Sequence, residues 1–231
     1  NEIGGVIVEP LQRLIPPATG FLQGLREVTQ HFEIPLIFDE IVTGFRLAYG
    51  GAQEYYNVTP DICTLGKAVA GGFPLTAVAG NEEIMGHFDS TSVLPDQHLP
   101  QLGTLSGNPV ACAAGLATLS ILRQNNTYQN LFERGKLLMQ GLQDTFHNAG
   151  IAAKVIGEPV LFDVFFTDRE VYDYRSGLNG NSQLLSEFNQ LLLNHGILKG
   201  ATKFYISTKH SREDIQITMA VFDQISETLK Q

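Results

Sequence analysis

Three short, mostly apolar runs in the first half of the chain constrain its fold more than any other feature. They lie at residues 5–9, 35–38 and 61–65, and a charged residue follows within two positions of the last apolar residue of each. Runs of this kind are typical of strands that are covered on both faces of a sheet. Between the first two runs, residues 21–32 place apolar side chains at nearly helical spacing. The order strand, helix, strand predicts an α/β fold.

The next part of the chain continues this pattern. Residues 75–80 predict a further strand of the same kind, and residues 103–122 predict a helix, for which Asn108 is a suitable N-cap and Pro109 fits the first turn. Several positions of this helix have little or no side chain: Ala111, Ala113, Ala114, Gly115 and Ala117. We therefore expect the helix to lie very close to neighbouring backbone.

A polar run at residues 124–127 predicts a linker, and we place the domain boundary there. Residues 1–123 form the first domain in this division, and residues 124–231 form a smaller α+β domain. The smaller domain is expected to contain a helix stopped by Gly150, strands at 152–156 and 160–166, a polar loop at 176–182, a helix closed by Gly196, a strand at 204–207, and a last helix with Ser211 and Asp214 in capping-box spacing. We expect the polar loop to be mobile or to face a partner.

The composition excludes several classes of protein. A chain of 231 residues that is 43% hydrophobic can bury a substantial core, and a net charge of −9 gives no basic surface for nucleic acid or an anionic membrane. No run of about 18 apolar residues predicts a membrane span. Two cysteines and six histidines form no disulfide framework and no metal motif, so we expect no metal and a reducing, cytoplasmic location. The first residue is not Met, so we expect a chain that begins inside a larger fold, or one that was processed.

Two charged residues stand where predicted strands end. Asp39 follows one apolar run and Lys67 follows another, so both side chains are expected to meet at one crevice beside the sheet. Thr104 and Ser106 make the entry to the later helix rich in hydroxyl groups, which suits a phosphate. A lysine, a carboxylate and a phosphate site are what pyridoxal phosphate requires. Each residue also has an ordinary alternative: a solvated lysine, a turn at a strand end, or caps for the helix.

Three blocks of the sequence resemble the signature blocks of class III aminotransferases, in the same order and with the same spacing. They are Phe38–Arg46, Thr59–Lys67 and Gly103–Pro109. Within that family the chain is most similar to the glutamate-1-semialdehyde aminomutase branch, through Val8–Pro10, Gly20–Glu27 and Gly51–Gln53. The resemblance implies a fold type I pyridoxal-phosphate enzyme, an α/β protein with a large-domain portion followed by a smaller α+β C-terminal domain. It also implies a homodimer whose active sites are shared between subunits.

The resemblance assigns a role to individual residues. Lys67 corresponds to the Schiff-base lysine, which afterwards shuttles a proton, and Asp39 to the partner of the pyridine nitrogen. Ile41 or Val42 is expected to pack against the cofactor ring. Thr104 is expected to bind the cofactor phosphate of the other subunit.

The expected activity is transfer of an amino group between a small amino donor and a keto or aldehyde acceptor. The donor is an amino acid, an amine or an amino-aldehyde. One alternative is glutamate-1-semialdehyde 2,1-aminomutase, and another is different pyridoxal-phosphate chemistry, such as racemisation or decarboxylation. A third alternative is a truncated remnant that only folds and dimerises, because the family's phosphate loop and stacking aromatic residue precede the position of Asn1.

Overall fold

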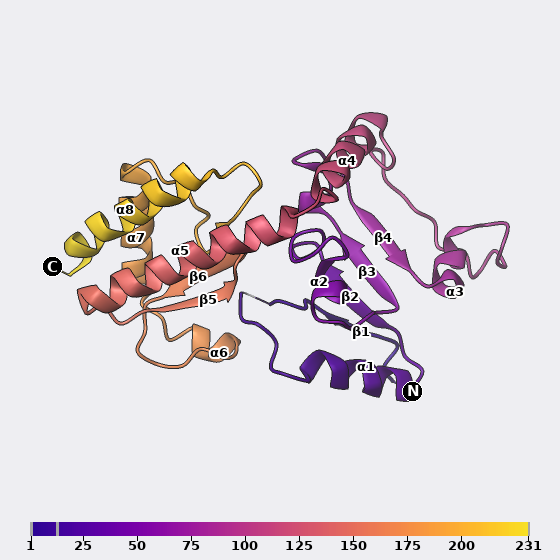
Figure 1. Ribbon diagram of the computed structural model, residues 1–231. Helices are drawn as coiled ribbons and strands as arrows, with labels where there is room; N and C mark the ends of the chain where they lie inside the picture. The colour runs from indigo at the N-terminus through magenta and orange to yellow at the C-terminus, as the bar shows by residue number, and fades with distance from the viewer. Residues whose placement is uncertain (1, 13, 231) are drawn as a thin grey trace. The chain divides into compact units, whose positions relative to one another are not determined.

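The structure, a computed structural model, describes residues 2–12 and 14–230 and divides into two compact units (Figure 1). Among these residues, the first unit holds 2–10 and 17–125, and the second holds 126–230 together with the short segment 11–16, apart from residue 13. The boundary thus lies between Asn125 and Asn126, two residues after the predicted position.

Segment 11–16, which the sequence division places in the first domain, is grouped with the second unit in the structure. Leu11, Leu14 and Ile15 are buried, with 2%, 2% and 9% of their surfaces exposed. Ile15 Cδ1 lies 3.6 Å from the point that a Cβ on Gly177 would occupy, which is within the second unit. Burial of these apolar side chains explains why the segment belongs to the second unit.

The first unit is built on a sheet of four strands in the order β1 (Val6–Val8), β2 (Leu36–Glu40), β3 (Ile62–Leu65) and β4 (Ala77–Gly80). The first three strands are parallel, as expected for the α/β fold. β4 is antiparallel to β3, and all four of its residues are exposed, so the prediction of another covered strand of the same kind was wrong. The connection at residues 66–76 explains the direction, because a return to a parallel strand takes a crossover of about a dozen residues or more.

Helix α1 (Phe21–His31) packs its apolar stripe against the sheet. Leu22 forms a buried cluster with Leu36, Phe38, Val58 and Cys63. In β2 buried and half-buried residues alternate, so Leu36, Phe38 and Glu40 lie on the buried face of the strand.

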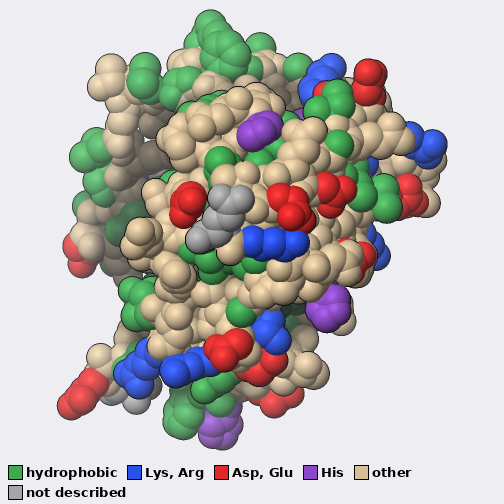
Figure 2. Space-filling view, turned by 90° about the vertical axis from the view of Figure 1, so that its left-hand side faces the viewer, with side chains coloured by type: hydrophobic (Ala, Val, Ile, Leu, Met, Phe, Trp, Pro, Cys, Tyr) green, Lys and Arg blue, Asp and Glu red, His purple; other side chains and the backbone are tan. Residues whose placement is uncertain are grey.

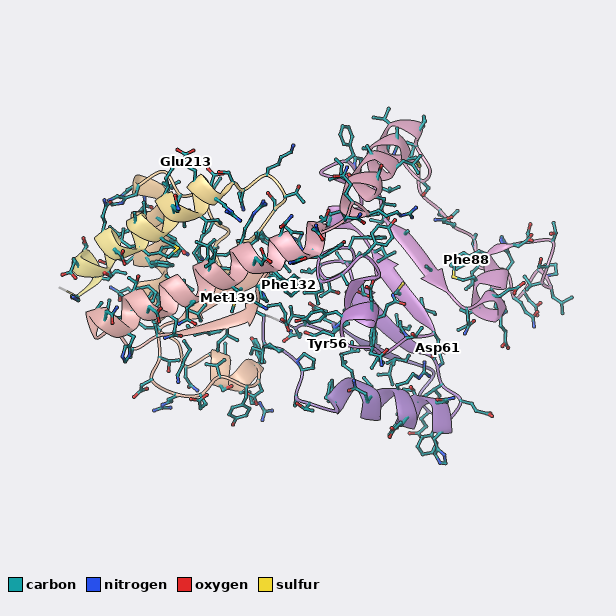
Figure 3. All side chains as sticks on the ribbon, in the orientation of Figure 1. Tyr56, Asp61, Phe88, Phe132, Met139 and Glu213 are labelled. Atoms are coloured by element: carbon teal, nitrogen blue, oxygen red, sulfur yellow. The ribbon has the colours of Figure 1, made fainter. Side chains whose placement is uncertain are left out.

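A single carboxylate ties the helix to the beginning of two strands. Asp61 Oδ2 accepts hydrogen bonds from Arg26 Nη1 of α1 at 2.8 Å and from the Leu36 amide of β2 at 2.7 Å. Figure 3 shows Asp61 directly before β3. This anchor lies at the opposite end of the strands from Asp39 and Lys67.

The remaining helices of the first unit are short except for the last. They are α2 (Gly51–Tyr55), the 3₁₀ helix η1 (Lys67–Ala70), α3 (Glu82–Met85), the 3₁₀ helix η2 (Gly86–Phe88) and α4 (Pro109–Leu122). The expected close approach of α4 is confirmed, since a Cβ on Gly115 would lie only 2.8 Å from Leu75 Cδ2 and 3.5 Å from the Val69 carbonyl oxygen of η1.

The second unit joins an antiparallel sheet to long helices. Its elements are α5 (Thr127–Ala149), β5 (Lys154–Glu158), β6 (Leu161–Phe165), α6 (Tyr174–Gly177), α7 (Ser182–Asn194), β7 (Phe204–Tyr205) and α8 (Arg212–Leu229). The sheet order is β5-β6-β7, and α8 packs against both α5 and α7 (Figure 1). Phe188 is fully buried at the centre, within 6.4 Å, centroid to centroid, of the rings of Phe146, Phe166, Phe204 and Phe222.

The polar stretch expected to be a loop at residues 176–182 is partly helical. Asp173 and Ser176 form a capping box that begins α6, and Ser176 is buried. Asn181 Oδ1 accepts a hydrogen bond from the Leu184 amide at 3.0 Å and caps α7. The polar side chains therefore accept hydrogen bonds from free amides at the starts of two helices, which the sequence pattern alone did not reveal.

On the face drawn in Figure 2, Lys and Arg side chains lie among Asp and Glu, without a continuous basic area over the residues described. In residues 2–12 and 14–230 no helix is both long enough and apolar enough to cross a membrane.

Candidate functional site

Asp39 lies at the carboxyl end of β2, opposite Thr64 in the parallel register with β3. Thr64 Oγ1 donates a hydrogen bond to Asp39 Oδ1 at 3.1 Å, and the Ile41 amide donates to the same oxygen at 3.1 Å. Asp39 and Thr64 are both half-buried. The carboxylate is thus held from two directions through one of its oxygens.

Lys67 follows β3 after a single residue, Gly66, and begins η1. Its side chain is exposed, and its φ of +47° lies in the left-handed region. This conformation costs a residue with a Cβ about 1–2 kcal/mol, and such strain is often found at functional sites. The backbone at this strand end therefore holds Lys67 in an uncommon conformation.

Ile41 lies against the backbone that precedes Lys67. A Cβ on Gly66 would be 3.0 Å from Ile41 Cδ1, so the space beside Gly66 is filled by this side chain. The carbonyl oxygen of Val42 accepts a hydrogen bond from Arg46 Nε at 3.0 Å. Of the two apolar residues predicted to pack on a ring, Ile41 is the one whose side chain adjoins the turn that carries Lys67.

Glu40 is a residue of this site that the sequence analysis missed. Its side chain is completely buried. Its carboxylate accepts hydrogen bonds from the Ala52 amide, the Gln53 amide (3.3 Å), Gln53 Nε2 (3.0 Å) and Thr43 Oγ1 (3.0 Å). Glu40 thereby joins the turn after Asp39 to the first amides of α2.

A sequence signal for this role did exist. Glu40 has the same parity in β2 as Leu36 and Phe38, so a strand with a period of two places it on the buried face. A buried carboxylate must be hydrogen-bonded. Gly51 is part of the same arrangement, because its φ is +73° and a Cβ there would overlap the Glu40 carboxylate.

Thr104 lies in the turn that precedes α4, and it is exposed. Among the residues described, no hydrogen bond joins it to Asp39 or Lys67. The alternative that Thr104 and Ser106 cap the helix is wrong, because Asn108 Oδ1 accepts the hydrogen bond from the Ala111 amide at 2.9 Å.

The two cysteines lie in or near packed regions. Burial raises the pKa of the Cys63 thiol, which belongs to the core cluster under α1, and Cys112 is half-buried in α4. Over the described part of the chain, no three His, Cys, Asp or Glu side chains are arranged to hold a metal ion.

The sequence profile described as Aminotransferase class-III matches residues 1–227. The chain belongs to the class-III aminotransferase family. This match confirms the family to which the three sequence blocks pointed.

Individual relatives agree with this assignment. The chain is 37% identical over 230 residues to glutamate-1-semialdehyde 2,1-aminomutase of Natranaerobius thermophilus. The aligned residues cover 97% of this chain and 52% of that protein. An omega-transaminase from Sphaerobacter thermophilus has a similar structure, with a TM-score of 0.92 and 31% identity over all of this chain and 53% of the other. A transaminase with PLP bound has a TM-score of 0.86 and 26% identity, over 97% of this chain and 52% of the other. The chain spans about half the length of the proteins it matches, and the α/β fold is that of transaminases.

Proposed function

We propose that this chain is the cofactor-anchoring half of a pyridoxal-phosphate-dependent aminotransferase. In this proposal Lys67 binds the cofactor covalently and Asp39 pairs with its ring nitrogen. The observation that carries the proposal is the adjacency of two strand ends: β2 ends in a carboxylate that is bonded to β3, and β3 leads directly into the strained Lys67. Membership of the class-III family supports it.

The residues present fit the cofactor. Both hydrogen bonds to Asp39 that involve described residues reach Oδ1, so Oδ2 is left to accept a bond from a ring nitrogen. Lys67 offers an exposed amine, and Ile41 provides an apolar surface beside Gly66, where a Cβ would be crowded. This set of a carboxylate, an amine and an apolar side chain matches the chemistry of a protonated aromatic aldehyde.

Bound pyridoxal phosphate would supply an electron sink for the negative charge that develops on the substrate carbon. The Lys67 amine would hold the cofactor at rest, and once released it would act as a general base that takes a proton from the substrate carbon. Asp39 keeps the ring nitrogen protonated through its charge. Ile41 excludes water from one part of the ring.

We further propose that Thr104 acts in the other subunit of a homodimer, where it binds the cofactor phosphate. Thr104 is exposed in the turn that leads to the N-cap of α4, Asn108, and the partial positive charge of a helix N-terminus favours an anion near that turn. The first unit then represents the C-terminal portion of a fold type I large domain, and the second unit represents the small domain. The cytoplasmic location stays a prediction from the sequence.

The substrates proposed are a small amino donor and a keto or aldehyde acceptor. The identity to glutamate-1-semialdehyde 2,1-aminomutase favours a second candidate, in which the amino group moves within one molecule. A test of acceptor dependence separates the two, because an aminomutase converts its substrate without a separate keto acceptor. Product formation that requires such an acceptor supports the aminotransferase.

Absorbance of the purified chain with added pyridoxal phosphate tests the cofactor site. We expect a visible band that disappears on treatment with borohydride and leaves the cofactor on the peptide that contains Lys67. Lys67→Ala should lack the band, whereas Lys136→Ala, which removes another exposed lysine, should keep it. A label on a different lysine, or no label, contradicts the proposal and favours a piece that folds without catalysis.

A further inference from the structure

Two donors of different origin hold the Asp39 carboxylate. The Ile41 amide belongs to the same turn, two residues further along the chain, so its bond forms wherever that turn forms. Thr64 is 25 residues away and lies on the neighbouring strand. The hydrogen bond from the Thr64 hydroxyl therefore holds the carboxylate in a defined position relative to β3.

The second donor restricts the orientation of the carboxylate. The terminal torsion of an aspartate is broad, so a single hydrogen bond leaves its plane free to turn. Two donors that reach Oδ1 from the backbone of Ile41 and from Thr64 fix that plane, and with it the direction of Oδ2. Thr64 is a rigid donor because its branched Cβ limits its side-chain torsion and its strand is paired in register with β2.

Thr64 also lies three positions before Lys67 on the same stretch of chain. The strand that orients the carboxylate is consequently the strand that delivers the lysine. The relative position of the two groups that the cofactor needs is set by one pair of adjacent strands, and the Thr64 hydroxyl is the side-chain contact between them.

We propose that Thr64 is a positioning residue, whose hydroxyl turns Oδ2 of Asp39 toward the cofactor ring nitrogen. This inference rests on the proposed function and adds to it a residue that does not touch the cofactor. A purely structural Thr64 would satisfy its hydroxyl on Asp39 without any effect on the bound cofactor.

The test compares Thr64→Val, which removes the hydroxyl at nearly constant shape, with Thr64→Ser, which retains it. The control is Thr218→Val in α8, where the hydroxyl donates to the Asp214 carbonyl oxygen at 2.7 Å and is far from Asp39 in the sequence. Three quantities are measured: the dissociation constant for pyridoxal phosphate, the position of the visible band, and the urea midpoint of the cofactor-free protein.

We expect Thr64→Val to weaken cofactor binding about tenfold, because a misdirected Oδ2 of Asp39 weakens one hydrogen bond with the charged ring nitrogen. The visible band should move to shorter wavelength, because a poorly oriented Asp39 supports the protonated ring nitrogen less well. Thr64→Ser should restore both quantities. Thr218→Val should change neither of them.

Two results overturn the inference. A Thr64→Val protein with a lowered urea midpoint but unaltered cofactor binding and band position makes Thr64 structural, and a failure of Thr64→Ser to restore binding excludes the hydroxyl as the cause. Borohydride labelling of the unaltered protein separates a failure of this inference from a failure of the proposed function. If the unaltered protein is labelled on Lys67, these results reject only the role of Thr64. If it is not labelled on Lys67, the proposed function is rejected as well.

Discussion

Lys199 Nζ lies 3.1 Å from Asp163 Oδ1, and the two side chains are only 2% and 3% exposed. Lys199 also donates to the Gly200 carbonyl oxygen at 3.0 Å and lies 5.1 Å from the centre of the Phe204 ring. Burial raises the pKa of Asp163 to about 6, although the charge of Lys199 opposes this change. Burial likewise lowers the pKa of Lys199, and Asp163 opposes that shift. Each charge therefore opposes the effect of burial on the pKa of the other.

Removal of one partner should be far more harmful than removal of both. At pH 7.5, Lys199→Met leaves a buried carboxylate without its cation, and we expect a loss of about 3–5 kcal/mol in the free energy of unfolding. The double variant Asp163→Leu/Lys199→Met should recover most of this loss, because well-packed apolar side chains replace a buried ion pair at little or no cost. Urea unfolding measures both. A double variant as unstable as the single one contradicts the prediction.

The raised pKa of Asp163 predicts a specific pH dependence of stability. The folded state takes up a proton near pH 6, whereas the unfolded chain does so near pH 3.8. The contribution of this group is thus fully present below about pH 4 and is lost as the pH rises through 6. Its contribution to the free energy of unfolding is at most about 3 kcal/mol, because the pKa of Asp163 rises from 3.8 to about 6 on folding. Urea unfolding between pH 4 and 6 should show this decline, and the double variant should lack it.

Other carboxylates act in a different pH range and do not obscure this effect. Hydrogen bonds from Ser176 lower the pKa of Asp173, and hydrogen bonds from Ser211 lower that of Asp214. A lowered pKa gives stability that is present above the unfolded value and lost as the pH falls through the folded one. Both caps therefore weaken below about pH 4, in the unaltered protein and in the double variant alike.

Glu40→Gln tests the buried carboxylate behind the site. The new amide nitrogen would face the donors of Ala52 and Gln53, so we expect a loss of about 2–3 kcal/mol in the free energy of unfolding. Glu187→Gln, at an exposed position of α7, should change stability by less than about 0.5 kcal/mol. Equal effects of the two substitutions in urea unfolding would show that the hydrogen bonds of Glu40 contribute no more than a surface charge.

Two glycines of α5 give opposite predictions for the same substitution. A Cβ on Gly135 would lie within the Pro159 carbonyl group, and backbone cannot yield, so Gly135→Ala should destabilise by about 1–3 kcal/mol or more. The atoms nearest to a Cβ on Gly141 belong to the flexible Met219 side chain, at 3.1 Å and beyond, and Gly141→Ala should stabilise by up to about 1 kcal/mol through helix propensity. Thermal unfolding of both variants measures the difference. Equal midpoints would contradict the close contact at Gly135.

Local sequence rules predicted the elements whose causes are local. The Ser211 and Asp214 spacing predicted the start of α8, and the structure has both bonds of that capping box, at 3.1 Å and 2.7 Å. Asn108 and Pro109 likewise begin α4 as expected. The direction of β4 follows from the short connection at residues 66–76, a local feature that the strand prediction did not use. The unit that holds residues 11–16 depends instead on contacts between distant parts of the chain, which no local pattern records.

The site shows the same difference between local causes and contacts of distant residues. The placement of Asp39 and Lys67 at adjacent strand ends follows from apolar runs and from the rule that parallel strands end at one edge. The bond between Thr64 and Asp39 depends on the register of two strands, and the hydrogen-bond partners of Glu40 depend on where α2 begins. The alternation in β2 indicates that Glu40 is buried, but neither register nor helix placement is contained in a motif, so the partners of these residues were missed.

The backbone at Lys67 separates the demands of folding from those of function. Lys67→Ala and Lys67→Gly both remove the amine, so both should abolish borohydride labelling. Only glycine adopts a φ of +47° without strain, and the side chain is exposed, so little packing is lost in either case. We expect the cofactor-free Lys67→Gly protein to be more stable than Lys67→Ala by about 0.5–1 kcal/mol in urea unfolding, since strain of about 1–2 kcal/mol exceeds the entropic penalty of glycine. A Lys67→Gly protein less stable than Lys67→Ala would mean that the left-handed conformation stores no strain. The opposite result would show that the chain gives up stability to hold its lysine in place.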